Sequence, residues 1–229
     1  MQNNLSIFTS VDRFERKWGI EKNIDFNAFI IAVYRSNFNF TESYKARKVN
    51  TIYFDDNSYS SINENLDGAT YKQKYRLRWY GESDIIINPQ LEIKSKIGLV
   101  SNKKTYPLDI PKEIKLNYKG IEEISKIFIK KLKTSKILYP VLSTHYLRHY
   151  FVSSNKHIRA TFDRNLKSHQ ICSLQNLSFK KDFNNSVFEI KYDKNYDNYV
   201  KNNLKKMSLR VSKSSKYVIS ALDEPVSFS

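Results

Sequence analysis

The amino-acid sequence predicts an α+β protein, namely an antiparallel β-barrel whose connecting helices pack outside it. Three observations predict this fold class. Segments of alternating apolar and polar residues recur along the chain, Lys and Arg gather on the polar side of these segments, and apolar residues at helical spacing occur between them. The 229 residues, of which 40% are hydrophobic, suffice for a sizeable core, and we expect a single domain over residues 1–229 with its core at about 11–221.

Strands are predicted in the first half of the chain near 11–19, 47–55, 70–81, 84–96 and 99–108. Successive side chains of an extended chain point to opposite sides. In the segment YKQKYRLRWY (71–80), this puts four cations opposite a face of aromatic and apolar residues; they are Lys72, Lys74, Arg76 and Arg78. Taken alone, the segment favours an ordinary strand whose charged face lies in solvent.

Helices are predicted at 25–35, 57–66 and 120–134, and the segment 195–207 is predicted as a polar helix or loop. The first begins after a candidate cap at Asn23 or Asp25, and the second precedes an Asp67-Gly68 turn. The third carries an apolar stripe that includes Ile124 and Phe128. Such stripes predict packing faces rather than ligand sites.

Strands are predicted in the second half near 141–153, 156–165, 186–193 and 213–221. Like the strands of the first half, they have one charged and one apolar face, because Arg148, Arg159 and Lys191 each alternate with apolar neighbours. A barrel that packs its apolar faces outward against helices and turns its charged faces into a lumen explains both features. Cations confined in such a lumen need a counter-charge, and the planar fork of arginine suits phosphate oxygens, so we expect a multiply charged phosphate ligand in a cationic tunnel.

The overall charge also indicates a polyanionic partner. Lys and Arg number 39 against 23 Asp and Glu, a formal charge of +16, which fits nucleic acid, an acidic membrane or a phosphate-rich small molecule. The single Cys172 gives no disulfide framework and fits a reducing compartment. The sequence starts without a signal-like segment and has no apolar run near the ~20 residues that a membrane span needs, so we expect a cytoplasmic protein without a membrane segment.

Seven motifs, in order, resemble one known family. They are RFERKW (13–18), YKQKYRLRWYG (71–81), LEIK (91–94), YPVLSTHYLRHYF (139–151), HIRATFD (157–163), FEIK (188–191) and SKSSKYV (212–218). Together they resemble the polyphosphate-polymerase domain of the vacuolar transporter chaperone (VTC) family, within the triphosphate tunnel metalloenzymes. That superfamily consists of antiparallel barrels around a cationic tunnel and typically opens on Glu-x-Glu-x-Lys. Here Arg13 replaces the first Glu, which favours the polymerase-like branch.

The resemblance implies a set of tunnel residues. For catalysis it implies Lys17, Arg76, Arg78 and Arg159. For phosphate binding it implies Lys94, Arg148, Lys213 and Lys216, to which the shared face adds Lys74 and neighbouring hydroxyls add Tyr146 and Ser215. One of Lys103 and Lys104 matches a further tunnel lysine. For a Mn²⁺ or Mg²⁺ ion it implies Glu189, and the charged faces add Glu15 and Glu92, although all three carboxylates fit equally well as ion-pair partners of the cations.

The expected reaction is therefore transfer of the γ-phosphoryl group of ATP to a polyphosphate chain. Hydrolysis of tripolyphosphate or a nucleoside triphosphate in the same tunnel is the nearest alternative, and a non-catalytic polyanion-binding module is another. Nucleic acid is disfavoured because, apart from Tyr146 and Tyr150, the aromatic residues lie mostly opposite the cations. The sequence leaves the preferred metal, the product length and the oligomeric state open.

Overall fold

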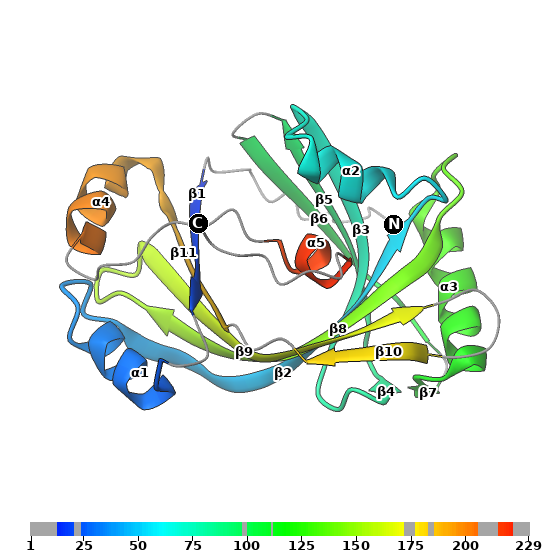
Figure 1. The fold of residues 1–229 in the computed structure, drawn as a ribbon, viewed down its shortest axis with the longest axis horizontal. Coiled ribbons are helices and arrows are strands. Elements are labelled where there is room, and N and C mark those ends of the chain that lie inside the picture. Colours follow the sequence, from blue (N-terminus) through cyan, green and yellow to red (C-terminus); the bar gives the residue numbers. More distant parts are fainter. Residues whose placement is uncertain are drawn as a thin grey trace, which may run out of the picture.

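The structure, a computed structural model, describes residues 13–20, 24–97, 100–110, 112–171, 177–182, 186–205 and 215–221. A curved antiparallel sheet of nine strands forms its centre (Figure 1). The hydrogen-bonded order is β1 (Arg13–Ile20), β11 (Ser186–Asp193), β9 (Ile158–Ile171), β8 (Tyr139–Val152), β2 (Thr41–Asp55), β3 (Tyr71–Tyr80), β5 (Gln90–Ile97) and β6 (Val100–Pro107). Strand β10 (Leu177–Asp182) pairs with β9 off this path, and β4 (Ile85–Ile86) pairs with β7 (Ile114–Lys115) in a separate sheet.

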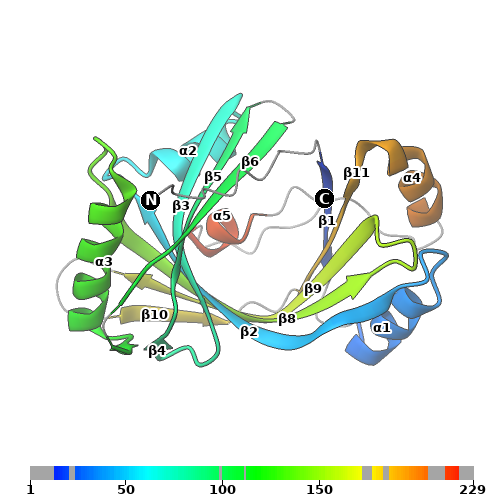
Figure 2. The same cartoon turned by 180° about the vertical axis from the view of Figure 1, so that it is seen from behind.

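The helices lie on both sides of this sheet. They are α1 (Phe26–Tyr34), α2 (Ser60–Leu66), α3 (Tyr118–Leu132), the 3₁₀ turn η1 (Lys194–Tyr196), α4 (Asp197–Lys205) and α5 (Lys216–Ala221). Helices α1, α3 and α4 lie outside the curve, whereas α5 lies within it in both views (Figures 1 and 2). The carboxylate of Asp25 accepts from the Ala28 amide at 2.8 Å, so the predicted cap of the first helix is confirmed.

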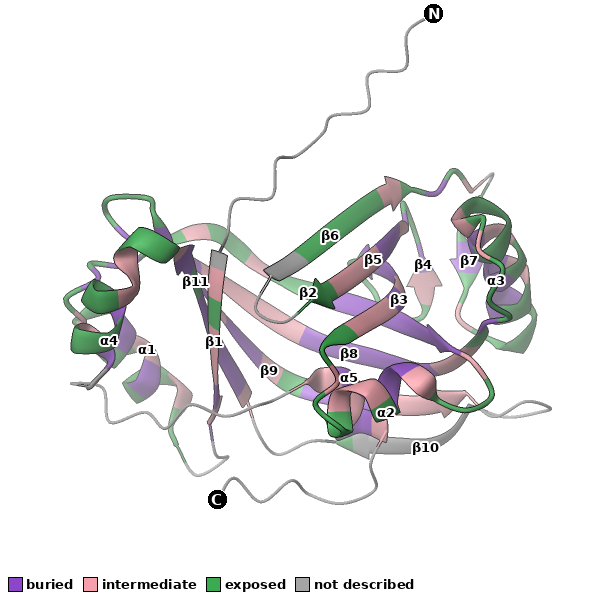
Figure 3. Ribbon diagram, turned by 90° about the horizontal axis from the view of Figure 1, so that it is seen from above, coloured by how far each residue is buried: buried purple, intermediate pink, exposed green. Residues whose placement is uncertain are grey.

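Two apolar cores pack beneath the outer helices. In one, Phe29 of α1 contacts Phe188 of β11 edge-on, with 5.3 Å between the ring centroids. In the other, Phe54 of β2 stacks on Phe128 of α3, with Leu77 fully buried beside them. Figure 3 shows the buried stretches along β2, β8 and β9 in the middle of the sheet. The apolar faces of the strands are thus turned outward, as the sequence predicts, and the charged faces line the inside of the curve.

The predicted strand at 213–221 is wrong where the structure describes it, because Lys216–Ala221 forms α5. Residues 213 and 214 lie outside the described residues. A tertiary contact selects the helix, since Tyr217 donates from its hydroxyl to Asp55 at 2.7 Å and stacks on Tyr53 at a centroid distance of 4.5 Å. Asp55 lies 162 residues away in the sequence, so no local pattern reports this contact.

The other differences concern strand ends. The predicted strand 84–96 is divided into β4 and β5, because Asn88 adopts φ 45° and Pro89 follows it. Strands β2 and β9 are longer than predicted, starting at Thr41 and ending at Ile171, and β10 was not predicted. The added part of β2 is mostly exposed and so shows no apolar alternation.

Closure of the barrel stays a prediction. The strand order of the described residues ends at β1 and β6, which do not pair with each other. Strand β5, the neighbour of edge strand β6, nevertheless reaches β1 through a side chain, because Lys94 Nζ of β5 lies 3.4 Å from Glu15 Oε2 of β1. Among the helices of the described residues, none has the length and apolar character that crossing a membrane requires.

Candidate functional site

A first cluster of charges joins β1 and β11 on the inside of the curve. The register places Lys17 opposite Glu189 and Glu15 opposite Lys191. Lys17 Nζ lies 2.5 Å from Glu15 Oε1 and 3.5 Å from Glu189 Oε2, and Lys191 Nζ lies 2.6 Å from Glu189 Oε1. Lys94 reaches Glu15 from β5 on the opposite wall. Two carboxylates therefore share lysines that come from three strands.

The lysines keep both carboxylates ionised. Burial alone would raise the pKa of Glu15, but Lys17, Lys191 and Lys94 outweigh burial and lower that pKa to about 2. Burial likewise opposes ionisation of Glu189, and Lys191 with Lys17 holds its pKa well below the usual value. Lys17 and Lys191 each pair with both carboxylates, so Glu15 and Glu189 are close neighbours.

A second cluster surrounds Glu92 of β5, whose side chain is only 1% exposed. Its Oε2 atom forms an ion pair with Arg76 Nε and lies 3.5 Å from Arg78 Nη1, while Lys103 of β6 pairs with Oε1. Burial raises the pKa of Glu92, but the two arginines and Lys103 reverse this effect and hold it far below the usual value. The structure thus shows Glu92 as the ion-pair partner that the sequence allowed, and it brings Lys103 rather than Lys104 into this cluster.

A third cluster surrounds Asp163 of β9, whose side chain is also 1% exposed. Arg148 of β8 donates to both carboxylate oxygens, from Nε at 2.6 Å and from Nη2 at 2.7 Å, and Lys216 of α5 pairs with Oδ2. The ring of Tyr146 lies 5.2 Å from Arg148 Cζ and 4.9 Å from Lys216 Nζ. Arg78 Nη2 lies 3.5 Å from the Tyr146 hydroxyl, so this cluster is continuous with the second one.

Helix α5 adds groups to the inside of the curve. Lys74 Nζ donates to Ser215 Oγ at 2.9 Å, just before the helix begins. The anchor described above, Tyr217 on buried Asp55, fixes the helix to the end of β2. These contacts hold Ser215 and Lys216 against the inner face of the sheet.

Cations outnumber carboxylates in the three clusters and the adjoining Lys74. The nine cations are Lys17, Lys74, Arg76, Arg78, Lys94, Lys103, Arg148, Lys191 and Lys216. The four carboxylates among the described residues of the clusters are Glu15, Glu92, Asp163 and Glu189. A partly buried surplus of positive charge of this size favours a polyanionic ligand.

The structure brings most of the predicted site residues into the clusters, with two exceptions. Arg159 is exposed and has no ion pair among the described residues, although its register opposite Lys191 places it on the same face. Lys213 lies outside the described residues. Sequence reasoning missed Asp163 and Lys191 as site residues, although both occupy charged-face positions in their motifs, HIRATFD and FEIK.

Glu15 and Glu189 fit a divalent metal ion better than Glu92 does. The described residues contain no group of three or more His, Cys, Asp or Glu that could hold a metal. Two neighbouring carboxylates are nevertheless sufficient for Mg²⁺ or Mn²⁺ when phosphate oxygens and water complete the octahedral shell. Glu92 lies on the other wall, and its cations pair with no second carboxylate among the described residues.

The amine of Lys74 makes anion binding by this surplus of cations depend on pH, and this dependence can be measured. Burial, followed by the charges of Lys17 and Lys94, lowers its pKa to about 7. A bound phosphate favours the charged amine and raises that pKa, so we expect anion binding to take up a proton near pH 8 and affinity to fall as pH rises above 7. Calorimetry with tripolyphosphate in buffers of different ionisation enthalpy measures this uptake. Lys74→Met should remove it, whereas Lys104→Met, an exposed lysine of β6, should not.

Tripolyphosphate itself exchanges protons when it binds, and this contribution cancels when the wild type is compared with Lys74→Met. Equal proton uptake by both proteins would contradict the attribution of the uptake to Lys74. The pH dependence of folding stability provides an independent test. The unfolded amine regains a pKa of about 10.4 and binds more protons between pH 7 and 10, so the contribution of Lys74 makes the anion-free protein more stable as pH rises through that range.

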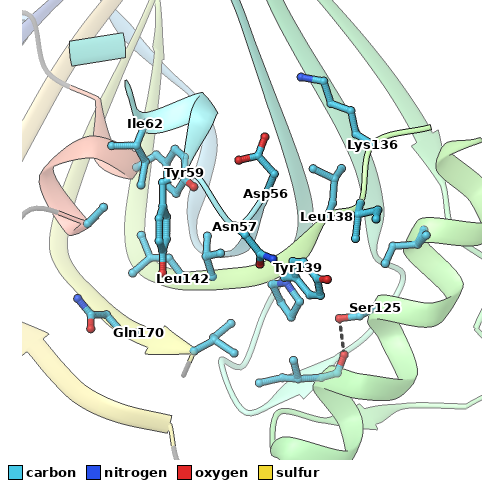
Figure 4. A pocket seen from close by; sticks show the side chains of 18 of the residues that line it. Asp56, Asn57, Tyr59, Ile62, Ser125, Lys136, Leu138, Tyr139, Leu142 and Gln170 are labelled. Atoms are coloured by element: carbon cyan, nitrogen blue, oxygen red, sulfur yellow. Dashed lines mark hydrogen bonds between the residues drawn. The ribbon is translucent and has the colours of Figure 1, made fainter. Parts of the chain in front are cut away.

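A separate cavity of about 1380 Å³ lies between α2, α3 and the start of β8 (Figure 4). Ile62, Ser125 and Leu142 line it, and Tyr217 of α5 borders it. Its lining mixes apolar side chains with scattered polar ones and lacks the ion-paired arginines of the three clusters. The cavity therefore differs in character from the charged inner face of the sheet.

Comparison with known proteins agrees with this fold. The family model described as VTC domain matches residues 12–222. No curated protein matches the chain. A proposed adenylate cyclase from Vibrio parahaemolyticus has a TM-score of 0.53 at 10% identity, covering 93% of this chain and 99% of that chain, which shows a shared fold.

A proposed adenylyl cyclase from Hippeastrum, described as having a dominant triphosphatase activity, has a TM-score of 0.45 at 12% identity, covering 90% of this chain and 94% of that chain. The match of the family model over almost the whole sequence confirms the resemblance that the seven motifs carry. The chain belongs to the VTC domain family.

Proposed function

We propose that this protein transfers the γ-phosphoryl group of ATP to the end of a polyphosphate chain and releases ADP. The observation that carries the proposal is the surplus of cations on the inside of the curve, held in place by buried carboxylates on two facing walls. Contact between Lys94 and Glu15 across the curve supports a tunnel in which a linear phosphate chain is enclosed on several sides.

The geometry of the arginines supports phosphate binding. Asp163 occupies Nε and Nη2 of Arg148, which leaves Nη1 for a further anion. Arg76 uses Nε toward Glu92, which leaves its two terminal nitrogens. Buried carboxylates thus fix the guanidinium planes without using all of their donors, so that phosphate oxygens meet preorganised groups.

The reaction needs no protein nucleophile. A terminal oxygen of the acceptor phosphate attacks the γ-phosphorus while the bond to the β-phosphate oxygen breaks, and the protein aligns the two phosphates and neutralises their charge. In this proposal Lys17, Arg78 and Arg148 bind the reacting phosphates, and Glu189 with Glu15 holds the Mg²⁺ or Mn²⁺ ion. A bound ion would offset the negative charge of the phosphates.

The decisive experiment is incubation with ATP and Mn²⁺, followed by separation of long-chain polyphosphate from orthophosphate. We expect polyphosphate and ADP from the wild type, and loss of product in the folded variants Arg76→Ala, Arg159→Ala and Glu189→Ala. Lys104→Ala serves as the control, because Lys104 is exposed and has no ion pair among the described residues. Orthophosphate without polyphosphate would indicate hydrolysis instead, and full activity in all three variants would overturn the tunnel site.

A further inference from the structure

Three tyrosines surround an arginine on the cationic face. Arg47 of β2 lies with Cζ 5.2 Å from the ring centroid of Tyr44, 5.2 Å from that of Tyr80 on β3 and 5.0 Å from that of Tyr150 on β8. Tyr44 and Tyr150 also contact each other edge-on, with centroids 5.8 Å apart. We refer to Arg47, Tyr44, Tyr80 and Tyr150 as the tyrosine platform.

The strand pattern places this platform next to the phosphate-binding residues. On β3 the inward positions end in Arg76, Arg78 and then Tyr80, the last residue of the strand. On β8 the alternation that turns Arg148 inward also turns Tyr150 inward, two residues further along. Arg47 itself pairs in register with Arg148. Along β3 and β8 the platform therefore follows the arginines with aromatic rings.

The platform is open to solvent and has unused binding capacity. Tyr44 is 62% exposed and Tyr80 is 40% exposed, so both rings keep surface that a ligand can contact. Arg47 is exposed and has no carboxylate partner and no hydrogen bond among the described residues. Arg76, Arg78 and Arg148, in contrast, are each held by a buried carboxylate.

Exposed tyrosine rings and a flat guanidinium are groups on which nucleobases stack. A polyphosphate chain has no aromatic face and gains nothing from such rings. A nucleoside triphosphate does, because its base can stack on the rings while its phosphates lie on the neighbouring arginines. We infer that Tyr44, Tyr80 and Arg47 form a nucleobase-stacking platform that distinguishes a nucleotide donor from inorganic polyphosphate.

This inference rests on the proposed function, because it assumes that a nucleoside triphosphate is the donor. It goes further in assigning a location and a set of side chains to the base. The interpretation that the rings only support Arg47 makes a different prediction, since loss of a ring would then affect the binding of every phosphate ligand equally.

The test compares dissociation constants for ATP and for tripolyphosphate by calorimetry. In Tyr44→Ala and in Tyr80→Ala, we expect ATP to bind about 10-fold more weakly, because stacking contributes ~1–3 kcal/mol per base and 1.4 kcal/mol corresponds to a factor of ten. Tripolyphosphate should bind within about twofold of its wild-type affinity. Tyr44→Trp should retain the affinity for ATP, since indole also stacks.

Tyr71→Ala is the matched control, because Tyr71 is another exposed tyrosine of β3 but lies on the opposite face, at 47% exposure. Unchanged ATP affinity in both platform variants, or equal losses for ATP and tripolyphosphate, would overturn the platform and leave the phosphate site standing. If the wild type binds neither ligand, the proposed function fails and the platform fails with it.

Discussion

Glu92→Gln is expected to lower the free energy of unfolding by about 3–5 kcal/mol, because it leaves buried cations without their counter-charge. The side chain of Glu92 is 1% exposed, and its partners Arg76 and Arg78 are 17% and 7% exposed. In a chain of this size, 1 kcal/mol corresponds to about 2–4 °C in Tm, so we expect a decrease of about 6–20 °C. Thermal unfolding followed by circular dichroism measures this change.

Tripolyphosphate should offset part of that loss. The variant has one negative charge fewer among its cations, so it should bind the anion more tightly and gain more stability from a given concentration than the wild type does. Glu82→Gln is the control, because Glu82 pairs with Lys48 on the surface and is 66% exposed, which predicts an effect under about 1 kcal/mol. Glu92→Gln with the stability of the wild type, or with no larger gain from the anion, would show that the cluster does not depend on this carboxylate.

The sequence predicts which face of each strand carries charge because the period of two is strict and the opposite face is apolar. Leu77 and Trp79 are fully buried in the core that includes α3, and Arg76 and Arg78, which alternate with them, are turned inward. This division required no knowledge of strand order. The positions of the cations on the inner face could therefore be derived from the sequence alone.

Which charged side chains of the inner face pair with one another could not be derived from the sequence in the same way. Whether Glu92 meets Arg76 or a metal ion depends on the register of β3 against β5, which pairs these two residues directly. Register is set by turns and by the packing of whole strands, and one step of slip would exchange the faces. Asp163 was missed for a related reason, since its partners Arg148 and Lys216 come from β8 and α5.

Arg148→Ala is expected to lower the rate of polyphosphate formation about 100- to 1000-fold, as is usual when one preorganised donor to a developing charge is lost. Arg148 has two tasks in the structure, however. It binds both oxygens of buried Asp163, and its Nη1, which has no hydrogen bond among the described residues, can bind an anion. A loss of activity in the single variant therefore does not separate anion binding from support of Asp163.

The variant Asp163→Asn separates the two tasks, because it removes the buried carboxylate and keeps both of its cations. Arg148 and Lys216 then lack their counter-charge, so we expect the free energy of unfolding to fall by about 3–5 kcal/mol. If Arg148 binds phosphate directly, polyphosphate formation and tripolyphosphate affinity should fall much less in Asp163→Asn than in Arg148→Ala. Equal losses in the two variants would instead mean that Arg148 acts only through Asp163, and the phosphate-binding role would then pass to Lys216, the other cation on the same carboxylate.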